Sequence, residues 1–123
     1  MTDIEYDDEI NLALGVTNLE RSVAFFGERL GFQKLFVDPK NRWATLGTFV
    51  QGVTLGLSEV ETAPGRGGAT PTFGVRDLDA VRSRLEAAEV AFDGNTVEIP
   101  GVTKFATFFD PDGNAFMLAQ KLR

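Results

Sequence analysis

The chain of 123 residues has neither cysteine nor histidine, and each absence removes a class of chemistry. Without cysteine there are no disulfides, thiol nucleophiles, iron–sulfur clusters or thiolate zinc sites. Without histidine, the commonest general base and the commonest metal ligand are missing. No apolar run approaches the ~20 residues of a membrane helix, and no signal peptide is visible at the start. We therefore expect a cytoplasmic protein with no membrane partner.

Basic side chains are also too few to form a general nucleic-acid surface. Five of the 18 acidic residues lie in residues 1–9, which contain no base, and this leaves 13 acids against 12 bases in the rest of the chain. A body of balanced charge has no excess of cations to neutralise phosphates, so nucleic acid is not an expected partner. Residues 1–9 are typical of an acidic, mobile tail.

A repeated segment divides the remaining residues, 10–123, into two similar halves. Residues 10–19 read INLALGVTNL and residues 69–78 read ATPTFGVRDL, so both end in Gly-Val-x-(Asn/Asp)-Leu at an offset of 59. Each segment begins with the alternation of a strand, which places Asn11 and Thr70 on one face and the larger apolar side chains on the other. The repeat predicts two copies of one structural unit.

Each predicted strand leads into a helix. Asn18 and Asp77 are suited to cap the two helices, because their side chains can accept hydrogen bonds from the free N–H groups of a first turn. Apolar residues then recur at helical spacing. They are Leu19, Val23, Phe26 and Leu30 in the first half and Leu78, Val81, Leu85 and Ala88 in the second.

Three further strands follow each helix. They are expected near 33–37, 42–47 and 53–57, and near 96–99, 104–109 and 115–119. The sequence thus predicts a single domain over 10–123 that contains two βαβββ modules, about 10–60 and 69–121. The segment between them, SEVETAPGRGGA, is rich in glycine and proline and is typical of a linker.

A module of this size covers only one face of its sheet with its single helix. We therefore expect an α+β fold in which the two modules form a cupped mixed sheet with the helices outside. Whether the modules pair within one chain or between two chains stays open.

The most distinctive segments are VTNLERSVAFFGERLGF (16–32) and FATFFDPDGNAFMLAQ (105–120). With the repeat, they make the chain resemble the vicinal oxygen chelate superfamily, which includes glyoxalase I, extradiol dioxygenases, and fosfomycin and bleomycin resistance proteins. The resemblance implies paired βαβββ modules and often a homodimer. It does not by itself fix the function, because one fold supports many activities.

In metal-using members of that superfamily, four inward side chains hold a divalent ion. The matching positions are Asn11, Thr70, Met117 and, within one or two places, Leu55. An amide, a hydroxyl, a thioether and an alkyl group are poor ligands for zinc, iron, manganese or nickel. We therefore expect neither a metal nor another cofactor.

The resemblance and this lack of metal ligands favour a metal-independent small-molecule binding protein. It would hold an aromatic or amphipathic ligand as the drug-sequestering, bleomycin-resistance-type members do, which suggests a role in antibiotic resistance. By alternation Phe105 and Phe109 share one face and Phe108 takes the other, but the sequence leaves open which face meets the ligand. The candidate ligand-binding residues are Asn11, Trp43, Leu55, Thr70, Phe105 and Met117.

Two alternatives remain. One is a glyoxalase- or dioxygenase-like lyase or oxidoreductase with an atypical or metal-free site. The other is a regulatory module whose cup is filled by its own side chains. We assign no catalytic residue, because Ser22, Ser58 and Ser83 have no histidine to activate them.

Overall fold

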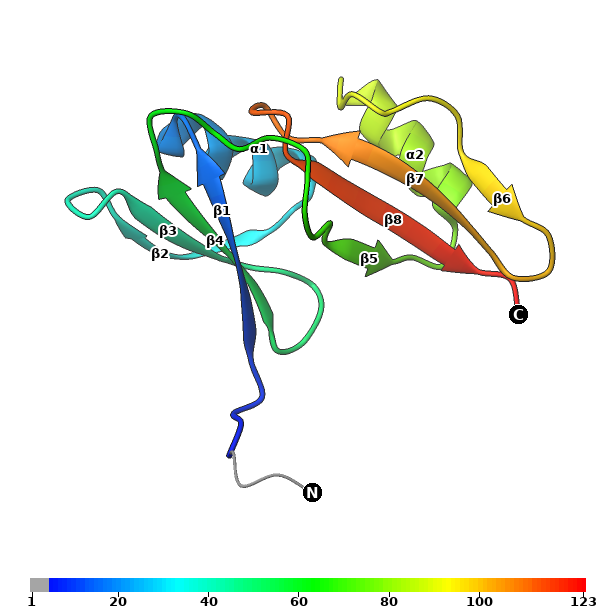
Figure 1. Cartoon of the computed structure of the whole chain (residues 1–123), viewed down its shortest axis with the longest axis horizontal. Coiled ribbons are helices and arrows are strands. Elements are labelled where there is room, and N and C mark those ends of the chain that lie inside the picture. The colour runs from blue at the N-terminus through cyan, green and yellow to red at the C-terminus, as the bar shows by residue number, and fades with distance from the viewer. Residues whose placement is uncertain (1–4) are drawn as a thin grey trace.

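The computed structural model describes residues 5–123, so part of the predicted tail, residues 1–4, lies outside the described range. The described residues form eight strands and two helices (Figure 1). In chain order these are β1 (Ile10–Val16), α1 (Leu19–Arg29), β2 (Gln33–Asp38), β3 (Trp43–Gly47), β4 (Val53–Glu59), β5 (Thr72–Gly74), α2 (Leu78–Ala87), β6 (Val97–Ile99), β7 (Thr103–Phe109) and β8 (Ala115–Lys121).

The predicted duplication is confirmed. The strand order is β1-β4-β3-β2 in the first sheet and β5-β8-β7-β6 in the second, so each half is a βαβββ module with one parallel pair and two antiparallel pairs. The α+β class and the mixed character of the sheets are as expected. The strands are distributed over two four-stranded sheets, with no pairing between β1 and β5 among the described residues.

Both helices begin at the predicted capping residues. The side chain of Asn18 accepts a hydrogen bond from Arg21 N, and that of Asp77 accepts one from Ala80 N. A second polar side chain from the last strand of each module completes the helix start. Glu59 Oε2 accepts from Leu19 N, and Gln120 Oε1 accepts from Leu78 N, each at 2.8 Å.

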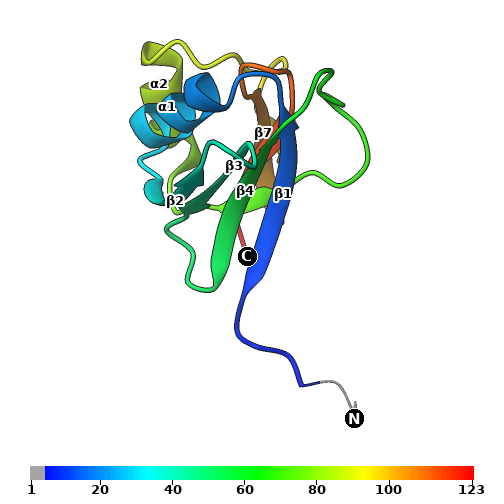
Figure 2. The ribbon, with the colours of Figure 1, turned by 90° about the vertical axis from the view of Figure 1, so that its left-hand side faces the viewer.

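The two helices lie on the same side of the molecule, and the linker between the modules passes on the opposite side (Figure 2). One continuous core fills the space between helices and sheets and joins the two modules. Phe26 of α1 packs against Phe116 of β8 with ring centroids 5.4 Å apart, and Phe32 lies 5.8 Å from Phe73 of β5. Because α1 packs on β2, β3 and β4, α2 packs on β7 and β8, and both helices lie on the same side of the molecule, each sheet keeps one face free of helices.

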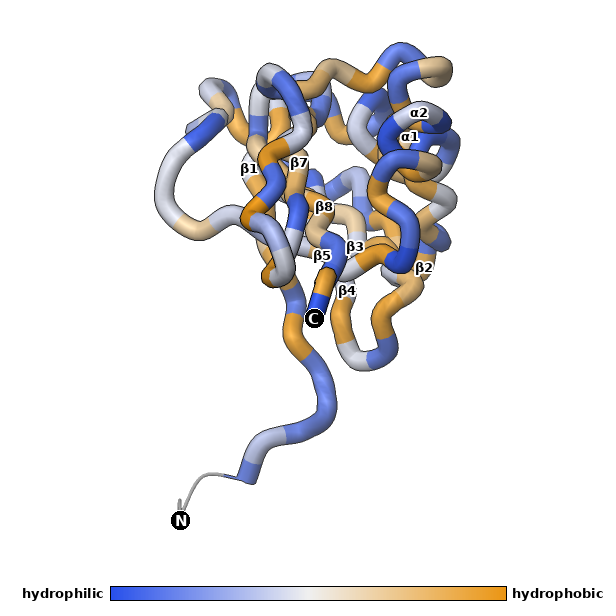
Figure 3. Tube along the Cα trace, turned by 90° about the vertical axis from the view of Figure 1, so that its right-hand side faces the viewer, coloured by the Kyte–Doolittle hydropathy of each residue, from blue (hydrophilic) through white to orange (hydrophobic). Residues whose placement is uncertain are grey.

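The described end of the acidic tail, residues 5–9, is exposed and extends away from both sheets (Figure 3). Its hydrophilic character gives it nothing to bury against the strands. Between residues 5 and 123, no helix has the length and apolar character needed to cross a membrane.

Candidate functional site

The strand register gives the first sheet two different faces. Leu12 pairs with Leu55, and Leu55 pairs with Leu46. Leu55 and Leu46 are buried beneath the helix, so the neighbours of these residues in sequence point to the uncovered side. We call that uncovered side the first open face. It is formed by Asn11, Ala13, Gly15, Trp43, Thr45, Gly47, Thr54, Gly56 and Ser58.

Trp43 and Asn11 meet over Gly56 at the centre of this face. A Cβ placed on Gly56 would lie only 2.5 Å from both Trp43 Cζ2 and Asn11 Oδ1. The indole Nε1 donates to Thr45 Oγ1 at 2.8 Å, and Asn11 Nδ2 donates to Thr54 Oγ1 at the same distance. The absence of a side chain on Gly56 therefore lets an aromatic ring lie close to the strand, beside an amide group.

The second sheet has a corresponding second open face. It includes Phe105 and Met117, and the alternation that places them there buries Phe108 completely on the helix side. The sequence did not decide between the face with Phe105 and Phe109 and the face with Phe108. The side without a helix is the one with Phe105 and Phe109. It is formed by Thr72, Gly74, Thr103, Phe105, Thr107, Phe109, Ala115, Met117 and Ala119.

Part of the second open face is covered by the linker. The guanidinium of Arg66 lies 5.5 Å from the centroid of the Phe109 ring and forms an ion pair with Asp93. Cation–π contact and ion pairing both fix the position of this arginine. The glycine-rich stretch predicted to be a simple linker thus also shields one of the aromatic side chains.

The registers identify equivalent positions in the two modules. Ala13 and Thr72 are 59 residues apart, as in the sequence repeat, and they pair with Gly56 and Met117, respectively. Gly56 is therefore the counterpart of Met117. One strand further along, the same reasoning makes Trp43 the counterpart of Phe105, so each open face presents an aromatic side chain at the same place.

This equivalence corrects one predicted position. The fourth of the four positions matched to metal ligands is Gly56 rather than Leu55, which is fully buried on the opposite face of β4 and cannot reach a ligand on the first open face. The displacement is one residue, and a single step along a strand changes the face. The sequence had located this position only to within one or two residues.

The other predicted site residues fall into three groups. Asn11 and Trp43 come together on the first open face, whereas Phe105 and Met117 share the second. Thr70 lies just before β5, half-buried, at a small cavity of about 160 Å³ that Gly15, Asn114 and the linker also line. The structure thus separates these residues into two pairs and a single threonine rather than gathering them around one point.

The residues at the four positions do not fit a transition-metal ion. Asn11, Gly56, Thr70 and Met117 provide an amide, no side chain, a hydroxyl and a thioether, and none of these is an imidazole, carboxylate or thiolate. No cluster of three or more acidic side chains that could hold a metal ion occurs within residues 5–123. These four side chains therefore support no metal-dependent reaction at this site.

Charged side chains near the strands are engaged on the helix side. Lys104 donates to Asp79 of α2 at 2.9 Å, and this hydrogen bond raises the pKa of Lys104 above its ordinary value. Arg42 pairs with Glu59 at 3.3 Å. Neither base lies on an open face, so neither is placed to hold an anionic ligand there.

The Asp-Pro-Asp-Gly turn before β8 forms a clamp between the modules. Asp112 accepts hydrogen bonds from Thr17 N and Arg21 Nη2, both at 3.0 Å, and Asn114 Nδ2 donates to the carbonyl oxygen of Gly15 at 3.0 Å. Burial disfavours the charge on Asp112, but the bonds from Thr17 and the charge of Arg21 outweigh it and lower the pKa of Asp112.

Asp110, in the same turn, is a second buried carboxyl group of the clamp. Burial raises the pKa of Asp110 above its ordinary value, although Asn114 and the backbone of Asp112 donate hydrogen bonds to it. Its bonds hold the turn in shape and leave it no contact with an open face. The two carboxyl groups of the turn therefore act in the structure rather than as an acid–base pair.

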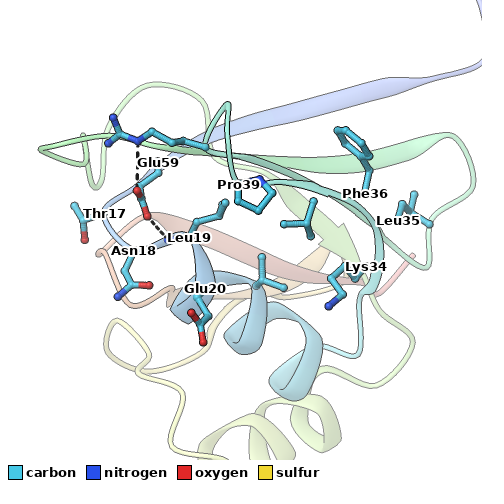
Figure 4. Close-up of a pocket in the computed structure, with 12 residues that line it drawn as sticks. Thr17, Asn18, Leu19, Glu20, Lys34, Leu35, Phe36, Pro39 and Glu59 are labelled. Carbon is cyan, nitrogen blue, oxygen red and sulfur yellow. Dashed lines mark hydrogen bonds and ion pairs between the residues drawn. The ribbon is translucent and has the colours of Figure 1, made fainter.

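A cavity larger than the one at Thr70 lies elsewhere, between the start of α1 and the β2–β3 hairpin (Figure 4). It has a volume of about 660 Å³ and is open to solvent. Glu59 crosses one end, where it binds both Arg42 and the backbone of Leu19. Its lining contains two acidic side chains, Glu20 and Glu59, and two basic ones, Lys34 and Arg42. Because these charges balance, the cavity favours neither an anionic nor a cationic ligand.

Solved structures with the same fold cover nearly the whole of this chain. A member of the glyoxalase/bleomycin resistance protein/dioxygenase superfamily from Sphaerobacter thermophilus superposes on this chain with a TM-score of 0.80 at 25% identity. The match covers 96% of this chain and 98% of the other. TnmS3, an antibiotic binding protein from Streptomyces sp. CB03234, has a TM-score of 0.75 at 25% identity, over 98% and 99% of the two chains.

A fosfomycin resistance protein, FosX from Listeria monocytogenes, has the same fold, with a TM-score of 0.78 at 16% identity over 94% of each chain. No curated protein is similar enough to this chain to be matched. The model of the Glyoxalase/Bleomycin resistance protein/Dioxygenase superfamily matches residues 10–118. Together with the two βαβββ modules, this match establishes that the chain belongs to the glyoxalase/bleomycin resistance protein/dioxygenase superfamily.

Proposed function

We propose that the protein binds a small aromatic or amphipathic molecule without a metal ion and sequesters it. The observation that carries this proposal is the chemistry at the equivalent positions of the two modules. Gly56 and Met117 are positions that the resemblance matches to donor groups of metal-using members, and the aromatic residues Trp43 and Phe105 occupy equivalent positions on the neighbouring strands. An apolar surface with few polar groups is the usual composition of a small-molecule site.

The similarity to TnmS3 supports the same function. That protein is an antibiotic binding protein, and its structure covers nearly the whole of this chain. We infer that the ligand of the present protein belongs to the same broad class, so that binding would protect a cell by sequestration.

We further propose that two copies of the chain form the complete site. A single chain leaves the helix-free side of each sheet without a full cover, since the linker shields only a part that includes Phe109, and the outer edges of β1 and β5 have no strand partner among the described residues. A second copy could pair with these edges and set the first open face of one chain against the second open face of the other. Exposed apolar side chains on β2 and β6, the strands at the other edge of each sheet, also favour a partner. They are Leu35, Phe36, Val97 and Ile99.

Tryptophan fluorescence tests the binding function, because Trp43 is the only tryptophan. A panel of aromatic antibiotics and metabolites should contain compounds that quench Trp43 at micromolar concentration, with no effect of a chelator. Met117→Lys should weaken this binding at least tenfold, because it places a positive charge with no opposite charge beside it on the second open face, where the ligand would bury it. Leu122→Lys, at an exposed position near the C-terminus, is the matched control.

Three results would overturn this proposal. One is a tightly bound, stoichiometric zinc or nickel ion in the purified protein. Another is chelator-sensitive turnover of a glyoxalase or dioxygenase substrate, which would favour an enzyme. A panel in which no compound binds better than millimolar would contradict sequestration. For the dimer, analytical ultracentrifugation should give twice the mass of the chain, and a monomer at all concentrations would refute it.

A further inference from the structure

We infer that the first open face selects an uncharged, flat aromatic group and orients it through one hydrogen bond, donated by the ligand to Asn11 Oδ1. This inference rests on the proposed binding function and adds to it the chemical class of the ligand and the polar contact that recognises it. Three features of the face lead to it: the fixed indole ring, the orientation of the amide, and the absence of charge.

The ring of Trp43 is held in one position before any ligand arrives. Its only polar atom, Nε1, already donates to Thr45 Oγ1, so the indole has no hydrogen bond left to offer. Its six-membered ring reaches over Gly56, where no side chain competes for the space. What the ring can still offer a ligand is an apolar aromatic surface, which favours a flat aromatic partner.

The amide of Asn11 is oriented by its neighbour. Asn11 Nδ2 donates to Thr54 Oγ1, and this bond turns Oδ1 toward the space above Gly56, beside the indole. Within residues 5–123, no group donates a hydrogen bond to Asn11 Oδ1. A ligand that covers this oxygen must supply a donor, because a buried acceptor without a partner costs about 1–3 kcal/mol.

The centre of the face carries no charge. The side chains around Gly56 are those of Asn11, Ala13, Trp43, Thr45 and Thr54. Asp38 lies opposite Trp43 on the edge strand β2, away from Gly56, and its carboxylate accepts two hydrogen bonds from Asn41. A charged ligand group would lose its hydration here without gaining an opposite charge, so an uncharged group is preferred.

Matched naphthalene probes test this selection. The probes are 2-naphthol, which is uncharged and has a donor; 2-methoxynaphthalene, which lacks the donor; and naphthalene-2-sulfonate, which is an anion. Binding can be followed at the single indole N–H signal of Trp43 in ¹H–¹⁵N correlation spectra. We expect 2-naphthol to bind about fivefold more tightly than 2-methoxynaphthalene, the value of one neutral hydrogen bond, and at least about tenfold more tightly than the sulfonate.

Two substitutions isolate the role of Asn11. Asn11→Leu should abolish the preference for 2-naphthol over 2-methoxynaphthalene, while 2-methoxynaphthalene still binds. Asn11→Asp should make the cation 2-naphthylmethylammonium the preferred probe. Asn95→Asp, an exposed asparagine in the second module, is the control and should change neither preference. The dispersion of the same spectra verifies that each variant is folded.

The outcomes separate this inference from the proposed function. Equal binding of 2-naphthol and 2-methoxynaphthalene, or a sulfonate that binds best, would overturn the inference. So would an Asn11→Asp variant with unchanged preferences. If no naphthalene probe binds but another compound of the aromatic panel quenches Trp43, the inference fails and the binding function stands. If nothing in either set binds, both fail.

Discussion

Gly56 shows how one residue without a side chain shapes a whole surface. It lies at the centre of the first open face, and both Trp43 and Asn11 extend over it from neighbouring strands. Glycine within a strand commonly marks a close approach of another group. The glycine in the predicted strand VTLGL (53–57) indicates such an approach, but the sequence does not identify the group that approaches it.

Gly56→Ala should destabilise the protein by about 1–3 kcal/mol, the usual cost of overpacking. The new methyl group would displace the indole of Trp43 or the amide of Asn11, so the fluorescence of Trp43 should change as well. The free energy of unfolding from urea titration measures the first effect. Gly74→Ala is the control, because no atom lies within 4 Å of the position of its Cβ, and its stability should stay within about 0.5 kcal/mol of the wild type. Equal losses in the two variants would contradict this account of Gly56.

Individual site residues could be predicted only where alternation and the repeat fixed their face. Asn11 was assigned from the start of a strand, and it does lie on the uncovered face. Leu55 was assigned by counting along a strand whose start was uncertain, and a single step placed it in the core. Because the period of a strand is two residues, such a count fails completely when it is wrong by one.

At the scale of the elements, each helix start uses one local and one distant side chain. The local caps, Asn18 and Asp77, were predictable because they lie next to the helix in sequence. The distant ones, Glu59 and Gln120, come from the last strand of each module, 40 and 42 residues away from the groups they bind. Contacts between residues so far apart depend on the tertiary structure, which a pattern in the sequence does not contain.

Glu59→Ala should lower the free energy of unfolding by about 1–2 kcal/mol. It removes the acceptor for Leu19 N and the partner of Arg42, and a helix start without its acceptor typically loses about this amount. Glu59→Gln keeps an acceptor oxygen and should recover most of the loss. Glu61→Ala, an exposed neighbour, serves as the control in the same urea titrations. A Glu59→Gln variant as unstable as Glu59→Ala would show that the charge, and not the acceptor, matters.

At the scale of the whole molecule, the two modules were predictable but their relation to each other was not. The repeat and the helical spacing gave the order of the elements in both halves. The contact between halves depends on Phe26 with Phe116 and on the clamp at Asp112, and both join residues about 90 positions apart. Neither could be read from the periodicity of a single segment.

The clamp at Asp112 gives stability that depends on pH. Because the pKa of Asp112 is lowered in the folded state, its contribution is complete above the ordinary pKa of about 4 and is lost as the pH falls through the folded value. Asp112→Asn should therefore cost about 1–2 kcal/mol near pH 7, because it removes the charge that strengthens the hydrogen bonds from Thr17 and Arg21.

Urea titrations of wild type and Asp112→Asn at neutral and acidic pH test this prediction. The difference between them should shrink as the pH falls below the ordinary pKa of an aspartate and through the lowered pKa of Asp112, because the carboxylate of the wild type is then protonated. Glu28→Gln, on the exposed surface of α1, is the control. A difference that stays constant with pH would mean that the charge of Asp112 does not hold the modules together.

The equivalence of the two open faces also bears on stoichiometry. They are alike in position but unlike in side chains, since Trp43 and Gly56 on one correspond to Phe105 and Met117 on the other. A two-fold pair of chains that brings unlike walls together must contain two identical pockets, so saturation would require one guest molecule per chain. Each bound ligand would contact an indole on one side and a thioether on the other, so it could bind in only one orientation.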